Sequence, residues 1–252
     1  MSPTTSDIHI YLKYLKSKKI KLINLTNQKN KLKNITSTAE LTIGNILNLT
    51  RNIIRIHSKF ITDRKFDKNN HLVSNKELTL GIIGMGRIGK HVANRAKALG
   101  FKIIYYDPYS KFKNFKKSKS LKDLIKNSNI LSIHMHYKDK YLNQFNLKTF
   151  KALKKPSYLV NTSRGEFIKE NDLIDSIKNR TLSGVGLDVL KNEFKSNFKN
   201  NPKKNKLFNF FIKNKKYNIF ITPKQGGSNK SAWGFTEKII INELIKYEKK
   251  YN

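Results

Sequence analysis

Three glycines stand in a pattern that suits the binding of a diphosphate group. Gly84, Gly86 and Gly89 form the sequence G-x-G-x-x-G, which follows the apolar run LTLGII and precedes a helix-like segment. In such a turn the first glycine permits a tight bend, the second lets the backbone approach a pyrophosphate, and the third lets the helix pack closely on the strand. The start of the helix then offers N–H groups and partial positive charge to the anion.

A carboxylate follows at the position where a dinucleotide's ribose is held. Asp107 ends the next apolar run, FKIIYY, and lies eighteen positions after Gly89, close to the expected spacing of about 20. Its oxygens can accept hydrogen bonds from ribose hydroxyls and repel a 2′-phosphate, which favours NAD over NADP. The alternatives are a glycine turn that only packs a helix and the glycine-rich turn of a methyltransferase, which lacks the full spacing.

The segments around these residues alternate between strand-like and helix-like patterns. Strands that alternate with helices predict a doubly wound parallel sheet, and therefore an α/β Rossmann fold from Leu78 to about Leu190. The predicted strands cover 78–84, 101–107, 129–136, 157–163 and 183–189, and the predicted helices cover 87–99, 120–128, 147–155 and 169–179.

The flanking segments predict further elements. Ser37 and Glu40 form a capping-box pattern that opens one long helix ending near Phe60. A polar connecting loop is predicted after it. Other predicted elements are a buried strand at 20–25, a short helix at 207–213, a last strand at 217–223 and a terminal helix at 228–247.

Composition narrows the function classes. The 252 residues carry a formal net charge of +35 and no cysteine, which excludes disulfides, thiolate metal sites and a cysteine nucleophile. The lysines are scattered along the whole chain, so we interpret them as a solvated basic surface with nonspecific attraction to polyanions. A dedicated polyanion-binding protein is the minor alternative. The six histidines show no metal-ligand spacing, and no signal peptide or membrane span is found, so we expect a cytoplasmic protein without a metal.

Four segments in order carry a family resemblance. GIIGMGRIGKHVANRAKALGFKIIYYDPY, NTSRGEFI, GVGLDVLKNE and ITPKQGG follow one another as in the D-isomer-specific 2-hydroxyacid dehydrogenases, which include D-3-phosphoglycerate and D-lactate dehydrogenases. STAELTIGNILNLTRNI resembles that family's interdomain helix. The resemblance implies an NAD-dependent oxidoreductase, phosphoglycerate dehydrogenase-like, that passes hydride between the nicotinamide and C2 of a D-2-hydroxy or 2-oxo acid. It also implies a homodimer.

The same resemblance assigns three catalytic residues. Arg164 corresponds to the arginine that binds the substrate's carboxylate and carbonyl, and a guanidinium fork suits both groups. Glu193 corresponds to the acid that pairs with the catalytic histidine, although a loop carboxylate among lysines is the alternative. Lys224 stands where the family has that histidine after Thr-Pro. A lysine paired with Glu193 stays protonated and can serve as a general acid when a ketone is reduced; loss of the catalytic group is the alternative.

The resemblance also completes the cofactor site. Asp188 corresponds to an acid beside the nicotinamide carboxamide, and His134 to a position near the cofactor. The predicted cofactor-binding residues are Gly84, Gly86, Arg87, Ile88, Gly89, Asp107, His134, Thr162, Asp188, Gly226 and Gly227.

The domain organisation follows from the same comparison of motifs. Residues 1–60 are predicted as a partial flavodoxin-like substrate domain with the interdomain helix, 61–222 as the NAD-binding Rossmann domain, and 223–252 as a segment returning toward the substrate domain. The start resembles the middle of the family's substrate domain, so several strands are expected to be absent. A catalytically impaired NAD-binding protein of the same family is therefore the second hypothesis.

Overall fold

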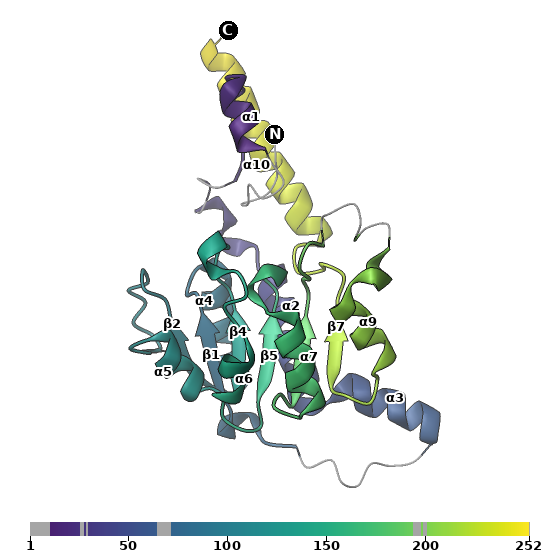
Figure 1. Ribbon diagram of the computed structural model, residues 1–252. Coiled ribbons are helices and arrows are strands. Elements are labelled where there is room, and N and C mark those ends of the chain that lie inside the picture. Colours follow the sequence, from purple (N-terminus) through teal and green to yellow (C-terminus); the bar gives the residue numbers. More distant parts are fainter. Residues whose placement is uncertain are drawn as a thin grey trace. The chain divides into compact units, whose positions relative to one another are not determined.

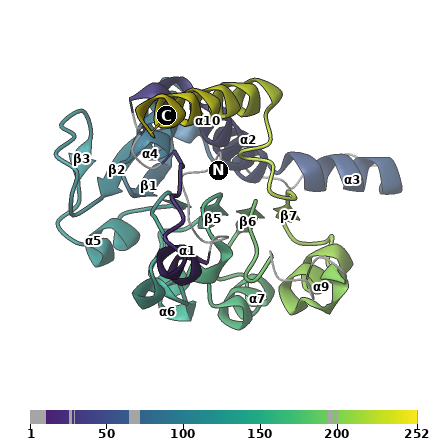
Figure 2. The same cartoon turned by 90° about the horizontal axis from the view of Figure 1, so that it is seen from above.

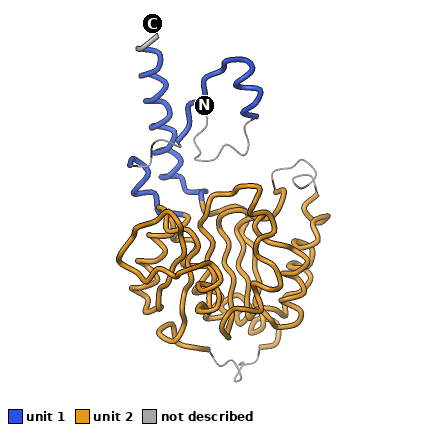
Figure 3. Tube along the Cα trace, turned by 60° about the vertical axis from the view of Figure 1, so that its left-hand side comes forward, with its two compact units in different colours: residues 1–37, 227–252 blue, residues 38–226 orange. Residues whose placement is uncertain are grey.

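A computed structural model describes residues 11–25, 28, 30–64, 72–193, 198 and 201–251. The chain forms two compact units, one of residues 1–37 with 227–252 and one of residues 38–226 (Figure 3). The predicted boundaries after residues 60 and 222 divide the chain by the function of each part. Compact units do not test such a division, so these boundaries stay a prediction.

The larger unit contains one parallel sheet of seven strands, in the order β3-β2-β1-β4-β5-β6-β7 (Figure 1). All neighbouring strands are parallel, which confirms the predicted doubly wound Rossmann fold. The short β3 was not predicted, because its two exposed lysines carry no apolar pattern. The strands are β1 (Thr79–Ile83), β2 (Lys102–Tyr106), β3 (Lys116–Lys117), β4 (Ile130–Ile133), β5 (Tyr158–Asn161), β6 (Gly184–Leu187) and β7 (Ile219–Ile221).

Helices cover both faces of this sheet, as Figure 2 shows from above. On one face α5, α6, α7 and α9 bury a core that includes Phe150 and Leu173. On the other face α2 and α4 bury a second core that includes Ile46 and Val92. The helices are α2 (Ser37–Arg51), α3 (Ile53–Asp63), α4 (Arg87–Ala98), α5 (Leu121–Lys126), α6 (Leu147–Lys151), α7 (Glu170–Lys178) and α9 (Lys206–Lys213).

Because both faces are covered, the central strands are apolar without alternation. All four residues of β4 are buried, as are all four of β5. This explains why continuous apolar runs, bounded by turn residues, predicted these strands.

The prediction of one helix from Ser37 to about Phe60 is wrong. The helix breaks at Asn52, which has a left-handed backbone with φ 55°, a conformation that asparagine tolerates better than most residues. The Asn48 side chain then accepts a hydrogen bond from the Ile54 N–H at 2.9 Å. The predicted capping box is also wrong, because α2 begins at Ser37 itself and the Ser37 hydroxyl has no hydrogen-bond partner among the described residues.

Among its described residues, the regular elements of the smaller unit are helices. This unit contains α1 (Leu12–Ser17), a 3₁₀ turn (Lys31–Asn34) and α10 (Lys230–Tyr251). The strand predicted at 20–25 is wrong: this segment has only a single β-bridge residue, at Asn24. Its apolar character has another cause, since Leu25 packs with Leu32, Ile239 and Ile240. Among the described residues, no helix is both long and apolar enough to cross a membrane.

Candidate active site

The glycine turn lies at the junction of β1 and α4, as predicted. Gly84 has φ 90°, and a Cβ atom there would lie 2.5 Å from the carbonyl oxygen of His134. A Cβ atom on Gly89 would lie 2.1 Å from the carbonyl oxygen of Gly84. Gly86 differs, because a Cβ atom there would meet no atom within 4 Å. The fold therefore requires the first and third glycines, and the space beside the second is open.

Helix α4 begins directly after Gly86, with Arg87 and Ile88 as its first residues. Gly86 is the N-cap and supplies no side-chain hydrogen bond to the helix, so the anion-binding end of α4 is not covered by a capping side chain. Burial lowers the pKa of the Arg87 guanidinium.

Asp107 follows β2 and faces the glycine turn. Its Oδ2 accepts a hydrogen bond from the Met85 N–H at 2.8 Å. Its Oδ1 accepts from the N–H groups of Tyr109 at 2.8 Å and Ser110 at 3.1 Å. A carboxylate has about four acceptor positions, so this anchored group can still accept a hydrogen bond from a ligand hydroxyl. The predicted carboxylate thus lies beside the predicted diphosphate turn.

His134 follows β4 on the other side of β1. Its N–H donates to the Ile83 carbonyl at 2.7 Å, and its Nε2 lies 2.8 Å from the Ser132 hydroxyl. Burial lowers the pKa of His134 to about 3, so its ring is neutral at physiological pH. A neutral ring adds no charge to the wall of the glycine turn.

Arg164 is held by the loop that follows β5. The buried Asn161 side chain donates to the Arg164 carbonyl at 2.8 Å and accepts hydrogen bonds from the Ser163 N–H and hydroxyl. Burial lowers the pKa of the Arg164 guanidinium, and the nearby carboxylates of Glu193 and Glu166 oppose that effect. Sequence reasoning missed Asn161; its only signal was a polar residue at the end of a buried strand.

Lys224 and Glu193 form the ion pair that the sequence predicts. Lys224 Nζ lies 2.5 Å from Glu193 Oε1, and Glu193 Oε2 accepts a hydrogen bond from the Leu190 N–H at 2.9 Å. Lys224 has a left-handed backbone, with φ 56°, and its N–H donates to the carbonyls of Asp188 and Thr222. The loop geometry therefore aims the lysine at this carboxylate.

Asp188 shapes the turn that carries Lys224. Its Oδ1 accepts from the Thr222 hydroxyl at 2.6 Å and the Gln225 N–H at 2.7 Å, and its Oδ2 accepts from the Gly226 N–H at 2.8 Å. The resemblance implied a place beside the nicotinamide. In the structure the buried carboxylate fixes the loop after β7, and its place beside the nicotinamide stays a prediction.

For Thr162 and Gly227, two further predicted cofactor-binding residues, the structure gives only their positions. The Thr162 hydroxyl lies 2.9 Å from that of Thr42, and Gly227 belongs to the other compact unit.

The predicted site residues of the larger unit all lie at one edge of the sheet. They follow the carboxyl ends of β1, β2, β4, β5, β6 and β7. The strand order reverses between β1 and β4, and ligands of doubly wound sheets bind at such a point. The described residues contain no His, Cys, Asp and Glu cluster suited to a metal ion.

Comparisons with known proteins point in one direction. Residues 43–226 match the model of the "D-isomer specific 2-hydroxyacid dehydrogenase, NAD binding domain". A putative 2-hydroxyacid dehydrogenase of Staphylococcus haemolyticus is 31% identical over 220 residues, which cover 83% of this chain and 64% of that protein. The chain thus spans less than two thirds of the length of this relative.

Solved structures agree. D-lactate dehydrogenase of Aquifex aeolicus, complexed with NAD and lactic acid, is 26% identical to this chain, with a TM-score of 0.83. The match covers 98% of this chain and 75% of the Aquifex aeolicus chain. A D-2-hydroxyisocaproate dehydrogenase, 22% identical, has a TM-score of 0.84 and covers 96% of this chain and 73% of its own. This second likeness concerns the fold alone.

Proposed function

Because the chain belongs to the D-isomer-specific 2-hydroxyacid dehydrogenase family and carries its NAD-binding domain, we propose that it transfers hydride between NAD(H) and C2 of a D-2-hydroxy or 2-oxo acid. The observation that carries this proposal is the geometry at one edge of the sheet. The diphosphate turn, the half-buried Arg164 and the Lys224–Glu193 pair all follow carboxyl ends of strands in the same unit.

The glycine turn is proposed to hold the cofactor. NAD supplies the hydride acceptor, and NADH the donor, when bound. The open space at Gly86 admits a pyrophosphate against the start of α4, where the helix dipole favours an anion. The remaining acceptor position of Asp107 suits a ribose hydroxyl, and its negative charge disfavours the 2′-phosphate of NADP.

Arg164 is proposed to anchor the substrate. Its guanidinium is partly desolvated, and a charge-assisted hydrogen bond is stronger where the surrounding dielectric is low. A 2-oxo acid presents a carboxylate and a neighbouring carbonyl, which a guanidinium fork can bind together. Asn161 keeps this arginine in place through its hydrogen bond to the backbone.

Lys224 is proposed to handle the proton. When a 2-oxo acid is reduced, the Lys224 ammonium would donate a proton to its carbonyl oxygen. Glu193 holds the ammonium in position at 2.5 Å. An ammonium paired with a carboxylate is a proton donor, which is the group that reduction of a 2-oxo acid requires. A phosphoglycerate-like substrate stays a prediction, since the solved relatives above are named for lactate and hydroxyisocaproate.

A homodimer is proposed through helix α3. None of the described α3 side chains is buried, and Ile53, Ile54, Phe60 and Ile61 are between 47% and 61% exposed. An apolar helix face of this kind is typical of a protein interface, and two copies of one chain can bury it symmetrically.

The test is a titration of NADH, followed by fluorescence, and then addition of pyruvate, 2-oxoisocaproate and 3-phosphohydroxypyruvate. Binding followed by NADH oxidation with one of these acids is expected. Binding without turnover of any 2-oxo acid would support the second candidate, a family member that binds NAD without catalysis. That candidate is favoured by one observation, the lysine at position 224 in place of the family's histidine.

A further inference from the structure

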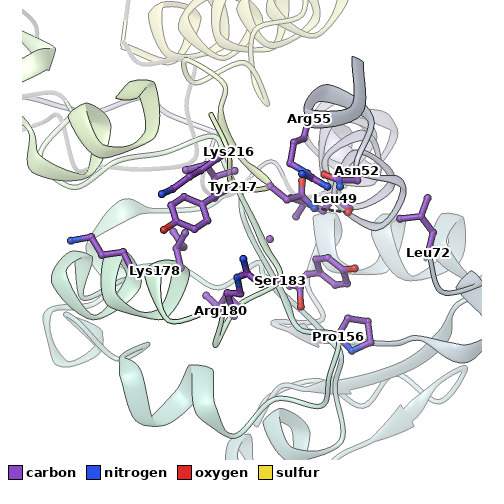
Figure 4. Close-up of a pocket in the computed structure, with 16 residues that line it drawn as sticks. Leu49, Asn52, Arg55, Leu72, Pro156, Lys178, Arg180, Ser183, Lys216 and Tyr217 are labelled. Atoms are coloured by element: carbon purple, nitrogen blue, oxygen red, sulfur yellow. Dashed lines mark hydrogen bonds between the residues drawn. The ribbon is translucent and has the colours of Figure 1, made fainter. Parts of the chain in front are cut away.

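A cavity lies at the edge of the sheet opposite the candidate active site, where β5, β6 and β7 begin (Figure 4). Its volume is about 640 Å³, within the range of small-molecule sites in proteins. The first residues of these strands, Tyr158, Gly184 and Ile219, line it. The candidate active site follows the carboxyl ends of the same strands, so the two sites are separated by the length of the sheet.

The lining of this cavity carries four positive side chains and, among its described residues, no acidic one. Arg55 comes from α3, Lys178 and Arg180 from the end of α7 and the turn after it, and Lys216 from the loop before β7. Figure 4 shows Arg55 and Arg180 reaching toward the space between the labelled residues, with Lys178 and Lys216 nearer its rim. The fold thus gathers cations from three separate parts of the chain.

The described contacts of three of these cations leave their charge in place. Lys178 lies over the Phe210 ring at 5.8 Å, and Lys216 lies over the Tyr217 ring at 5.2 Å, contacts that leave an ammonium charged. The Arg180 guanidinium makes no ion pair with any described residue.

The dipole of α7 accounts for only part of the cluster. Cations are favourable near the carboxyl end of a helix, which suits Lys178 and Arg180. It does not explain why Arg55 and Lys216, from other elements, line the same cavity.

We propose that this cavity is a second anion site, which binds a small phosphorylated molecule. Guanidinium groups bind phosphate oxygens in pairs, and Arg55 and Arg180 offer two of them. The volume exceeds the need of one phosphate group, and the rings of Tyr158 and Tyr217 give the remainder of an organic phosphate an aromatic wall. This site is additional to the cofactor site and needs no turnover.

The test uses inorganic pyrophosphate as the probe. The full chain is first saturated with NADH, which occupies the glycine turn, and pyrophosphate is then titrated by calorimetry. We expect one further binding event per chain. The double variant Arg55→Gln/Arg180→Gln should weaken it by about 100-fold or more, since it removes two charge-assisted guanidinium contacts.

The matched control is Lys122→Gln/Lys126→Gln on α5, which removes the same charge from exposed positions and should leave the affinity unchanged. Arg180→Gln alone serves if the double variant unfolds, as judged by its thermal transition. The proposal is overturned if pyrophosphate gives no binding heat, if the control weakens binding equally, or if only an oligonucleotide binds and pyrophosphate does not.

Discussion

At the scale of single residues, the fold explains Gly84 and Gly89, whereas cofactor binding explains Gly86. A Cβ atom at Gly84 or Gly89 would collide with backbone, whereas one at Gly86 meets open space. Gly86 has φ −77°, which any residue adopts. Its lack of a side chain is therefore explained by an approaching ligand.

We expect Gly86→Ala to leave the thermal transition unchanged and to weaken NADH binding by at least about tenfold, equal to about 1.4 kcal/mol. Calorimetric titration and a thermal melt of the same sample measure both quantities. Gly89→Ala is the contrasting variant, and it should lower the melting temperature. Unchanged NADH affinity in folded Gly86→Ala would contradict the proposed cradle.

Lys224 is the residue on which turnover depends in this account. We expect Lys224→Met to slow reduction of a 2-oxo acid by about 10²–10⁴-fold, the usual worth of a positioned proton donor, with NADH affinity retained. Lys224→His should restore part of the rate, and Lys126→Met on α5 is the control. Full activity in Lys224→Met would remove the lysine from the mechanism.

His134 makes stability depend on pH. The unfolded chain protonates this histidine near pH 6.5, whereas burial lowers the folded-state pKa to about 3. Between these values the unfolded state binds more protons, so the free energy of unfolding falls as pH falls, by up to about 1.4 kcal/mol per pH unit. Above about pH 6.5 this contribution is fully present.

Urea unfolding of the wild type and of His134→Gln at several pH values between these two limits measures this slope. The variant should lose this part of the pH dependence, while His136→Gln, at an exposed position, should keep it. Equal slopes in the wild type and His134→Gln would show that His134 titrates normally.

Some residues of the site could be predicted from the sequence and others could not. Glycine spacing predicted the turn and Asp107, which lie close together in the sequence, and the family resemblance predicted the Lys224–Glu193 pair, whose members lie 31 positions apart. The holding roles of Asn161 and Asp188 were not predicted. Asp188 bonds to residues 34 to 38 positions away, and Asn161 bonds to residues two and three positions away; in both cases only the folded loop defines the partner.

At the scale of elements, the apolar pattern was informative where the sheet buries a strand and misleading elsewhere. The runs at β4 and β5 are buried on both faces and were predicted. The run at 20–25 is also apolar, but Leu25 is buried by helix packing rather than by strand pairing. The break at Asn52 escaped prediction because apolar residues continue through α3.

Helix α3 is expected to form the interface of a homodimer. Replacing its exposed Ile54 and Phe60 by aspartate should turn a dimer into a monomer, because two charges cannot be buried unpaired in an apolar interface. Light scattering after size-exclusion chromatography measures the mass. The control, Ile241→Asp on α10, also changes an exposed apolar residue and should keep the dimer. A monomeric wild type, or a dimer in the double variant, would contradict the proposal.

At the scale of the whole molecule, the two proposed binding sites lie at opposite edges of one sheet. Its carboxyl edge gathers the candidate active site, and its amino edge opens into a cavity lined by cations. The formal net charge of +35 adds a general attraction to anions, which is why the second anion site is tested against a control variant of matched charge. Composition predicted the general attraction, but it could not predict where cations converge.

The most direct test of the central claim is a crystal structure of the full chain with NAD. We predict density for the pyrophosphate against Gly86 and the first turn of α4, with a ribose hydroxyl hydrogen-bonded to Asp107. Density for the cofactor at any other place, or a pyrophosphate that lies away from this turn, would contradict the account.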